Sequence, residues 1–284
     1  MFTKTSRYSV YSLLFLFTVL PLLAGFGFAL SYSFGLTGVL KTGLTLANWQ
    51  KLFAEGNVFR SFIYSAGIAL VSLFCAVGVS ILLALKYANS FQKGVLNYLI
   101  YIPLAFPGIA AAFLFFQVFT KSGLLSRIFY RLNVIDSMND FPDLVNDAYS
   151  ISMISCFFFL AVPFFLLLFI NIIKAERIAE YEQLAATLSA TKRQTRWKIS
   201  VPIMLKKVLP NIILYFIFIF GAFEIPLLLG RSHPETISVL AVRKLQRFNL
   251  LDLPQGYAVA VLYSVFVMVL LYFLFRTKKM ADHA

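Results

Sequence analysis

The sequence predicts an all-α integral membrane protein with six transmembrane helices and a cytoplasmic helix pair between the fourth and the fifth. Composition is the first observation: of 284 residues, 60% are hydrophobic and 13% are charged, whereas a soluble domain carries roughly 25% charged residues. Six apolar stretches of roughly 20 residues or more are each long enough to cross a bilayer. A polar, basic segment at about 175–202 separates the fourth stretch from the fifth.

The six expected spans form a single transmembrane domain over residues 1–284. They are placed at 9–31, 61–85, 95–119, 149–173, 208–230 and 256–275. The first span follows Lys4 and Arg7, as the apolar core of a signal peptide would. Its apolar run from Val10 to Leu30 is longer than the usual core of about 7–15 residues, so we expect it to be retained.

Four prolines fall inside the expected spans and predict interruptions: Pro103, Pro107, Pro163 and Pro226. A proline removes a backbone donor and tends to kink a helix. In a membrane such a break is tolerated where protein or a water-filled cavity satisfies the freed carbonyls. Pro103 and Pro107, with Gly108 after them, therefore predict a span that lines a pathway. A kink used only for packing is the alternative.

Basic residues favour an orientation with both termini in the cytoplasm. This orientation places 15 Lys and Arg residues inside and 10 outside, as the positive-inside rule requires. The net charge of +13 would suggest nucleic acid in a soluble protein. Here the charges flank apolar spans, so we expect membrane lipids as surroundings and no nucleic acid as a partner.

The segment between the fourth and fifth spans predicts two short helices. Leu184 and Leu188 are four residues apart, as are Ala186 and Ala190, so one helix carries a greasy stripe beside a stripe of small residues. Small residues allow another surface to approach a helix backbone closely. This first helix is expected to end near Ala190.

A second, basic helix is expected to start at Lys192. Thr191 followed by Gln194 fits a capping box, in which each side chain bonds the other residue's backbone N–H. Pro202 is expected to end this helix just before the chain re-enters the bilayer. On physical grounds alone, docking onto a soluble partner and a basic interfacial role remain equal alternatives.

At these residues the sequence resembles the membrane subunits (permeases) of type I ATP-binding-cassette (ABC) importers. Their hallmark is a cytoplasmic loop with the pattern E-A-A, three residues, G, nine residues, a hydrophobic residue, one more residue and L-P. The chain matches that pattern in order, although Glu182 stands one position before the family Glu. Gln183 takes the place of that Glu, Leu184 and Ala185 take the places of the two Ala, and Ser189 takes the place of Gly. Ala190 then matches the next Ala, and Val201–Pro202 match L-P. If the family Gly adopts a left-handed backbone, Ser189 is expected to resist it and alter the turn.

Three further segments are similar to the same family. Residues 44–49 resemble the extracytoplasmic segment after the first span, and residues 102–108 resemble the Pro-rich third span. Residues 221–230 are similar to a segment of the branch that serves spermidine and putrescine, iron(III), sulfate and thiamine.

The resemblance implies a non-catalytic, multi-pass subunit of a bacterial cytoplasmic (inner) membrane importer, which forms half of the translocation path. It implies a cytoplasmic ATPase dimer that binds ATP and magnesium, a second permease expected to be a different chain, and an extracytoplasmic solute-binding protein. The expected cargo is a small solute such as a polyamine or ferric ion. This chain is expected to bind no cofactor. The residues expected to couple to the ATPase are Glu182, Gln183, Leu184, Ala185, Ala186, Leu188, Ser189, Ala190 and Pro202.

Glu224 is the only acid placed inside an expected span. A charge at the bilayer centre costs about 2.5–3.5 kcal/mol on insertion scales, so it is expected to face a cavity or a partner. One hypothesis is that it lines the translocation path and favours a cationic cargo, together with Phe223, Pro226, Pro103 and Pro107. The alternative is a hydrogen bond to a neighbouring helix, or a pair with a base of the second permease.

Two other function classes are weaker. A stand-alone secondary transporter or channel would need several ionisable residues within its spans. A membrane-embedded enzyme would need a motif such as GxSxG or HExxH, and the chain has neither and no phosphate-binding P-loop. ATP hydrolysis must therefore come from another chain. Cys75 and Cys156 lack metal-ligand spacing, so we expect two small buried side chains and no metal site.

Overall fold

The computed structural model describes residues 13–39, 41, 43–88, 91, 94–247 and 249–281, and over these residues every regular element is helical. Six of the described helices are long and apolar enough to cross a membrane, which confirms the predicted fold class. Residues 9–12 of the expected first span lie outside the described part. The chain divides into two compact units, 1–62 with 237–273 and 63–236 with 274–284.

The first unit is held together by aromatic packing and by an ion pair whose lysine is buried. The ring centroids of Tyr32 and Tyr257 lie 4.4 Å apart. The side chain of Lys244 is 3% exposed, and its Nζ lies 2.9 Å from Glu55 Oε2 and 2.6 Å from Gln255 Oε1. The elements are η1 (Phe15–Val19), α2 (Leu20–Ser33), α3 (Ala47–Ala54), the start of α4 (Asn57–Tyr87), α13 (Ile237–Gln246), η6 (Leu250–Asp252) and most of α14 (Leu253–Ala281).

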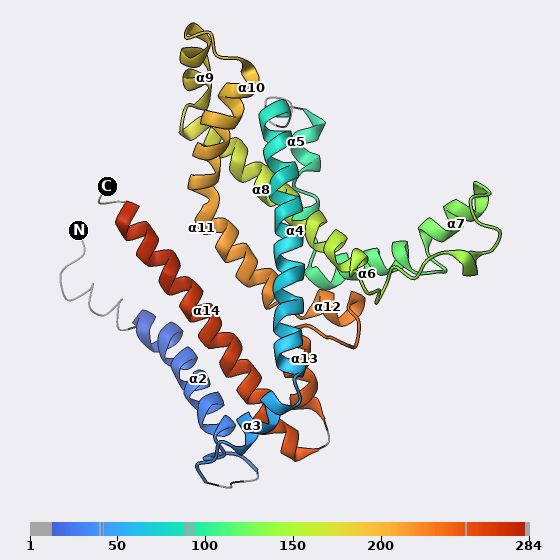
Figure 1. Ribbon diagram of the computed structural model, residues 1–284, viewed down its shortest axis with the longest axis vertical. Coiled ribbons are helices and arrows are strands. Elements are labelled where there is room, and N and C mark those ends of the chain that lie inside the picture. Colours follow the sequence, from blue (N-terminus) through green and yellow to red (C-terminus); the bar gives the residue numbers. More distant parts are fainter. Residues whose placement is uncertain are drawn as a thin grey trace. The chain divides into compact units, whose positions relative to one another are not determined.

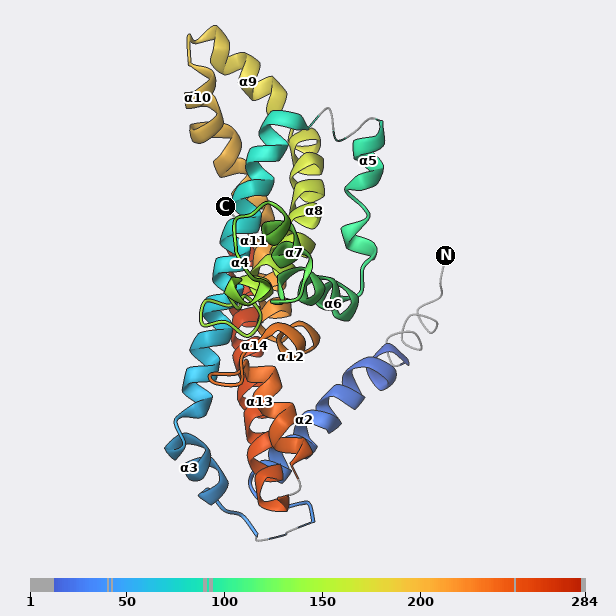
Figure 2. The ribbon, with the colours of Figure 1, turned by 90° about the vertical axis from the view of Figure 1, so that its right-hand side faces the viewer.

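The second unit is built around α8 (Ile151–Ala175), which packs against α6, α11 and α12 (Figures 1 and 2). Its buried face carries Phe157, Phe165 and Phe169, each at most 1% exposed, so an aromatic core sits along this helix. The other elements are the rest of α4, α5 (Val95–Leu99), η3 (Pro103–Ala105), α6 (Gly108–Phe119), α7 (Leu124–Arg131), η4 (Met138–Asp140), α9 (Ile178–Thr187), α10 (Lys192–Thr195), η5 (Arg196–Ser200), α11 (Val201–Phe220), α12 (Glu224–Leu229) and the end of α14.

The expected third span, 95–119, is interrupted near Pro103 and Pro107, where the sequence predicted a break, but its limits are wrong. It is divided into α5, η3 and α6, and the chain is extended at Pro107 (φ −60°, ψ 146°). Pro107 explains the break, because it cannot donate to a preceding carbonyl and disfavours helical backbone in the residue before it. That residue, Phe106, is extended, whereas Ile102 before Pro103 keeps a helical backbone and Pro103 starts η3. The apolar stretch long enough to span begins at Gly108 and continues through α7 to Arg131.

The expected fifth span, 208–230, is also wrong in its limits. The helix runs from Lys192 to Phe220, and α12 starts only after an interruption at 221–223. Pro202 lies in the first turn of α11 and does not end the helix. The backbone just before it, η5, forms a π-helical turn, which widens the helix where the proline ring would otherwise crowd the preceding turn.

The second, fourth and sixth spans are found close to the expected limits, at 57–87, 151–175 and 250–276. The interruption expected at Pro163 is not found, since α8 continues through it. Ser80 Oγ donates to the carbonyl of Val162, one residue earlier, at 3.0 Å. Cys156 is buried as expected, but Cys75 is exposed on α4 in the isolated chain.

Candidate functional site

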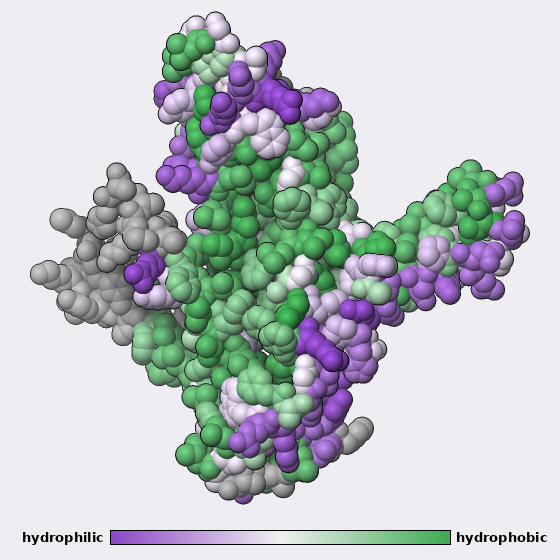
Figure 3. Space-filling model, viewed as in Figure 1, coloured by the Kyte–Doolittle hydropathy of each residue, from purple (hydrophilic) through white to green (hydrophobic). Residues whose placement is uncertain are grey.

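The candidate site is the helical pair α9–α10, which lies at one end of α11 in the second unit (Figure 1). Polar side chains gather over this pair, whereas hydrophobic side chains cover the spanning helices next to it (Figure 3). Such a change in polarity is what a segment that leaves the bilayer requires.

The first helix of the pair ends at Thr187, three residues earlier than expected near Ala190. Ser189 adopts a left-handed backbone (φ +60°). The Ser189 N–H donates to the Ala186 carbonyl at 3.0 Å, and the Ala190 N–H donates to the Ala185 carbonyl at 3.0 Å. These two bonds form a Schellman motif, which satisfies the last carbonyls of a helix and turns the chain. Ser189 therefore adopts the left-handed backbone, and the turn forms with serine in the place of the family glycine.

The second helix starts at Lys192, as predicted, and the expected capping box is confirmed. The Gln194 N–H donates to Thr191 Oγ1 at 3.3 Å, and the Thr191 N–H donates to Gln194 Oε1 at 2.9 Å. Both ends of the connection between the helices are thus held by local hydrogen bonds, so α9–α10 is a defined turn.

A hydrogen bond that the sequence did not reveal joins α9 to η5, the helical turn that continues α10. Ser200 Oγ donates to Glu182 Oε1 at 2.8 Å. Ser200 is fully buried and Glu182 is half-buried. The residues are 18 positions apart, so no short motif marks them. The only sign of this bond in the sequence is that Glu182 stands one position before the Glu of the family pattern.

The expected coupling residues divide between two faces of α9. Leu184 and Leu188 are 62% and 82% exposed, whereas Ala185 is 7% exposed and packs inward. Gln183 and Ala186 are exposed. The described chain therefore presents two large apolar side chains to the outside on a polar loop. Such exposure is typical of a surface that a partner covers.

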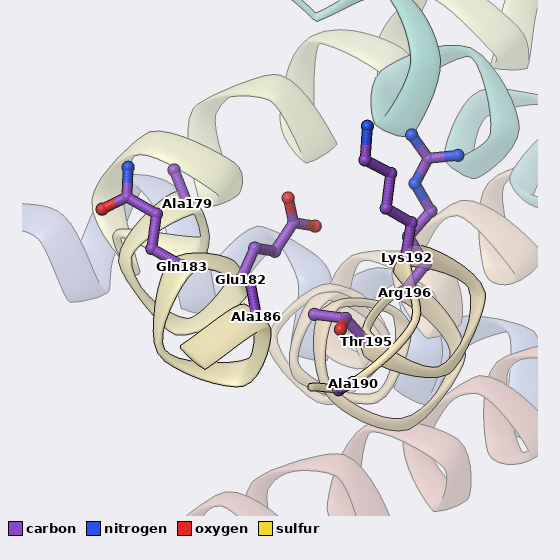
Figure 4. Close-up of a pocket in the computed structure, with 8 residues that line it drawn as sticks. All are labelled: Ala179, Glu182, Gln183, Ala186, Ala190, Lys192, Thr195 and Arg196. Carbon is purple, nitrogen blue, oxygen red and sulfur yellow. The ribbon is translucent and has the colours of Figure 1, made fainter. Parts of the chain in front are cut away.

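A groove of about 390 Å³ lies between α9 and α10, and we call it the loop groove (Figure 4). Its walls carry small side chains together with an acid and two bases. The lining residues are Ala179, Glu182, Gln183, Ala186, Ala190, Lys192, Thr195 and Arg196. Pro202 lies beyond this groove, in the first turn of α11.

The residues expected to line the path lie where the third and fifth spans are broken. The short helix α12 packs against α6, and a methyl group on Gly108 would lie 3.1 Å from Glu224 Oε2. Phe223 immediately precedes α12 and Pro226 is buried within it. The structure thus brings Glu224 to the start of α6, close to Pro107, while Pro103 lies in η3.

A second groove, of about 480 Å³, lies between α8 and α11 and was not predicted. It is lined by Phe164, Asn211, Leu214, Tyr215 and Phe218. The ring centroids of Phe164 and Tyr215 are 5.2 Å apart. We call it the aromatic groove. The only sign of this groove in the sequence is Asn211, a polar residue within an apolar run.

Comparison with known proteins identifies the type of chain. Residues 76–279, well over half of the chain, match the family model described as binding-protein-dependent transport system inner membrane component. The fold is similar to a crystal structure of a bacterial alginate ABC transporter in complex with an alginate pentasaccharide-bound periplasmic protein. That match has a TM-score of 0.70 and 18% identity, and it covers 95% of this chain and 93% of that one.

A second crystal structure has the same fold, that of a bacterial ABC transporter involved in the import of the acidic polysaccharide alginate. The TM-score is 0.72 at 17% identity, over 97% of this chain and 96% of the other. The likeness therefore extends over the whole architecture.

Proposed function

This chain belongs to the family of binding-protein-dependent transport system inner membrane components, and from that premise we propose that α9–α10 couples transport to a separate cytoplasmic ATPase. The chain is accordingly a non-catalytic, multi-pass permease subunit of an ABC importer in the inner membrane. The observation that carries the proposal is that the second helix of the loop is continuous with the fifth span. The helix that starts at Lys192 in the loop runs without interruption to Phe220 within the fifth span.

This continuity lets a displacement of the loop move the fifth span. A partner that covers Leu184 and Leu188 would hold α9, and the bond between Glu182 and Ser200 would pass its displacement to α11. A flexible linker would absorb the same displacement. The Schellman turn and the capping box keep the pair rigid.

The assembly that we propose has four kinds of subunit. A cytoplasmic ATPase dimer binds ATP and magnesium and drives the cycle. This permease and a second, different permease each form half of the path, and a solute-binding protein delivers cargo from outside. Both termini lie in the cytoplasm, as the distribution of basic residues predicts.

For the cargo we propose a small polar solute. The finer expectation of a polyamine or ferric ion rested on residues 221–230 alone, and the comparisons do not support it. The aromatic groove contains the amide of Asn211 and the hydroxyl of Tyr215, and no charged residue lines it. Aromatic faces with a few polar groups suit an uncharged, hydroxylated solute.

For Glu224, which is exposed in the described chain, we propose the packing alternative over the path. Its carboxylate lies beside the first residue of α6, where the helix dipole is positive and favours an anion. We therefore expect Glu224→Gln to retain most solute uptake, and Asn211→Ala to reduce uptake with the ATPase still bound. Reduced uptake by Glu224→Gln in an intact assembly would restore the path hypothesis for Glu224.

The decisive experiment is affinity purification in mild detergent followed by mass spectrometry. Wild type is compared with a variant that carries Ala186→Glu and Ala190→Glu, and with a control in which both alanines become serine and stay small. We expect an ABC ATPase with wild type and the control, and none with the Glu variant. If no ATPase accompanies any of them and the purified chain alone moves solute, the protein is a stand-alone transporter or channel.

A further inference from the structure

The loop groove is already formed without a partner. The Schellman turn fixes one end, the capping box fixes the start of α10, and the bond between Ser200 and Glu182 connects the walls. Little conformational freedom would be lost when a ligand enters such a groove, which favours binding.

The charges of the groove are unevenly compensated. Lys192 and Arg196 are four residues apart, and their side chains lie side by side and extend the same way (Figure 4). Within the described part of the chain neither forms an ion pair or a side-chain hydrogen bond. Glu182 is the only acid in the lining, and its Oε1 accepts from Ser200. One end of the groove therefore carries two cations without a counter-ion.

We propose that the loop groove accepts an acidic side chain of the cytoplasmic ATPase, which Lys192 and Arg196 bind. This inference rests on the proposed function and names the chemistry of the partner. A guanidinium binds a carboxylate through two parallel hydrogen bonds, and an ammonium adds a point charge. Ala179, Ala186 and Ala190 leave room for the methylene stem of the acidic residue.

A carboxylate suits the groove better than a phosphate. The Glu182 carboxylate lies in the same lining, and it repels a dianion more strongly than a single charge. The groove therefore favours a protein carboxylate over a doubly charged phosphate such as the terminal phosphate of a nucleotide, and the crosslink described below distinguishes it from a singly charged phospholipid head group.

Charge reversal tests the proposal on the intact complex. One variant carries Lys192→Glu and Arg196→Glu. The matched control carries Arg193→Glu and Lys198→Glu, which make the same change in net charge at exposed positions of the same helix outside the groove. The ATPase retained per permease is measured after purification at low and high salt.

We expect the groove variant to retain at least about tenfold less ATPase than the control at low salt. A photo-crosslinker in place of Ala186 should attach to an ATPase peptide that contains Asp or Glu. Equal retention by the two variants, or a crosslink to lipid or nucleotide, overturns the groove proposal alone. Absence of an ATPase with wild type overturns the proposed function itself, so the two failures are distinguishable.

Discussion

Two regions of the second unit, the loop α9–α10 and the broken spans at α6 and α12, stabilise the starts of their helices differently. At the start of α10 the side chains of Thr191 and Gln194 cap the helix. At the starts of α6 and α12, no described side chain forms a cap hydrogen bond. There the chain relies on close packing of α12 against α6, with Glu224 beside Gly108.

The difference follows from the surroundings. A loop in water must keep its own turn defined against competing solvent, so its hydrogen bonds are local. Within an apolar layer the freed backbone groups of a broken helix need partners from elsewhere in the protein or from a water-filled cavity, because lipid offers none. Variants in each region test whether local hydrogen bonds stabilise the loop and whether contacts between helices distant in sequence stabilise the broken spans.

The largest effect is expected at the break. In Gly108→Leu the new side chain would meet Glu224 Oε2 and Ile225, and such overpacking costs about 1–3 kcal/mol. The midpoint of thermal unfolding in detergent, followed by intrinsic fluorescence, should fall. Gly67→Leu is the control, because nothing lies within 4 Å of a methyl group at Gly67. A Gly108 variant as stable as the Gly67 variant would show that the contact between α6 and α12 is loose.

The next effect is expected where the loop is joined to α11. Ser200→Ala removes the donor to a half-buried carboxylate, at a cost of about 1–2 kcal/mol. A double-mutant cycle with Glu182→Ala isolates the bond, since Ser200→Ala should cost clearly less in the Glu182→Ala background. Equal costs in both backgrounds would mean that the two residues do not interact.

A smaller loss is expected at the cap of α10. Thr191→Ala deletes the hydroxyl that accepts from Gln194, and loss of an N-cap costs about 1 kcal/mol. Thr191→Ser keeps the hydroxyl and should be close to wild type. Hydrogen exchange of the Gln194 amide reports the cap directly. An exchange rate unchanged in Thr191→Ala contradicts local capping.

The smallest effect has the opposite sign. Ser189 has a left-handed backbone, which disfavours residues with a Cβ atom by roughly 1–2 kcal/mol. Glycine removes this cost, but its greater freedom in the unfolded chain offsets part of the stabilisation. Ser189→Gly should therefore stabilise the protein by about 0.5 kcal/mol. Ser189→Ala should not. Destabilisation by Ser189→Gly would show that the hydroxyl matters more than the backbone.

Short-range patterns predicted part of this structure well. The capping box at Thr191, the start of α10 at Lys192 and the limits of the second, fourth and sixth spans came from residues at most a few helical turns apart. The limits of the third and fifth spans were wrong. A hydropathy window cannot distinguish a continuous helix from two helices joined at Pro107 or at 221–223.

The candidate site shows the same division. The family pattern indicated the loop, and the exposure of Leu184 and Leu188 agrees with a surface on it. The bond from Ser200 to Glu182 and the aromatic groove were missed. Each depends on residues brought together by packing of whole helices, for which no local spacing gives a signal.

The sequence by itself determined that this chain is a six-span membrane protein with a polar helical loop between the fourth and fifth spans, because hydropathy, charge and caps act over a few residues. Only the tertiary structure decided that Ser200 holds Glu182, that Glu224 lies beside Gly108, and that Lys192 and Arg196 extend from one groove. Those arrangements depend on how separate helices pack against one another. Packing is a property of the whole fold, which no single segment contains.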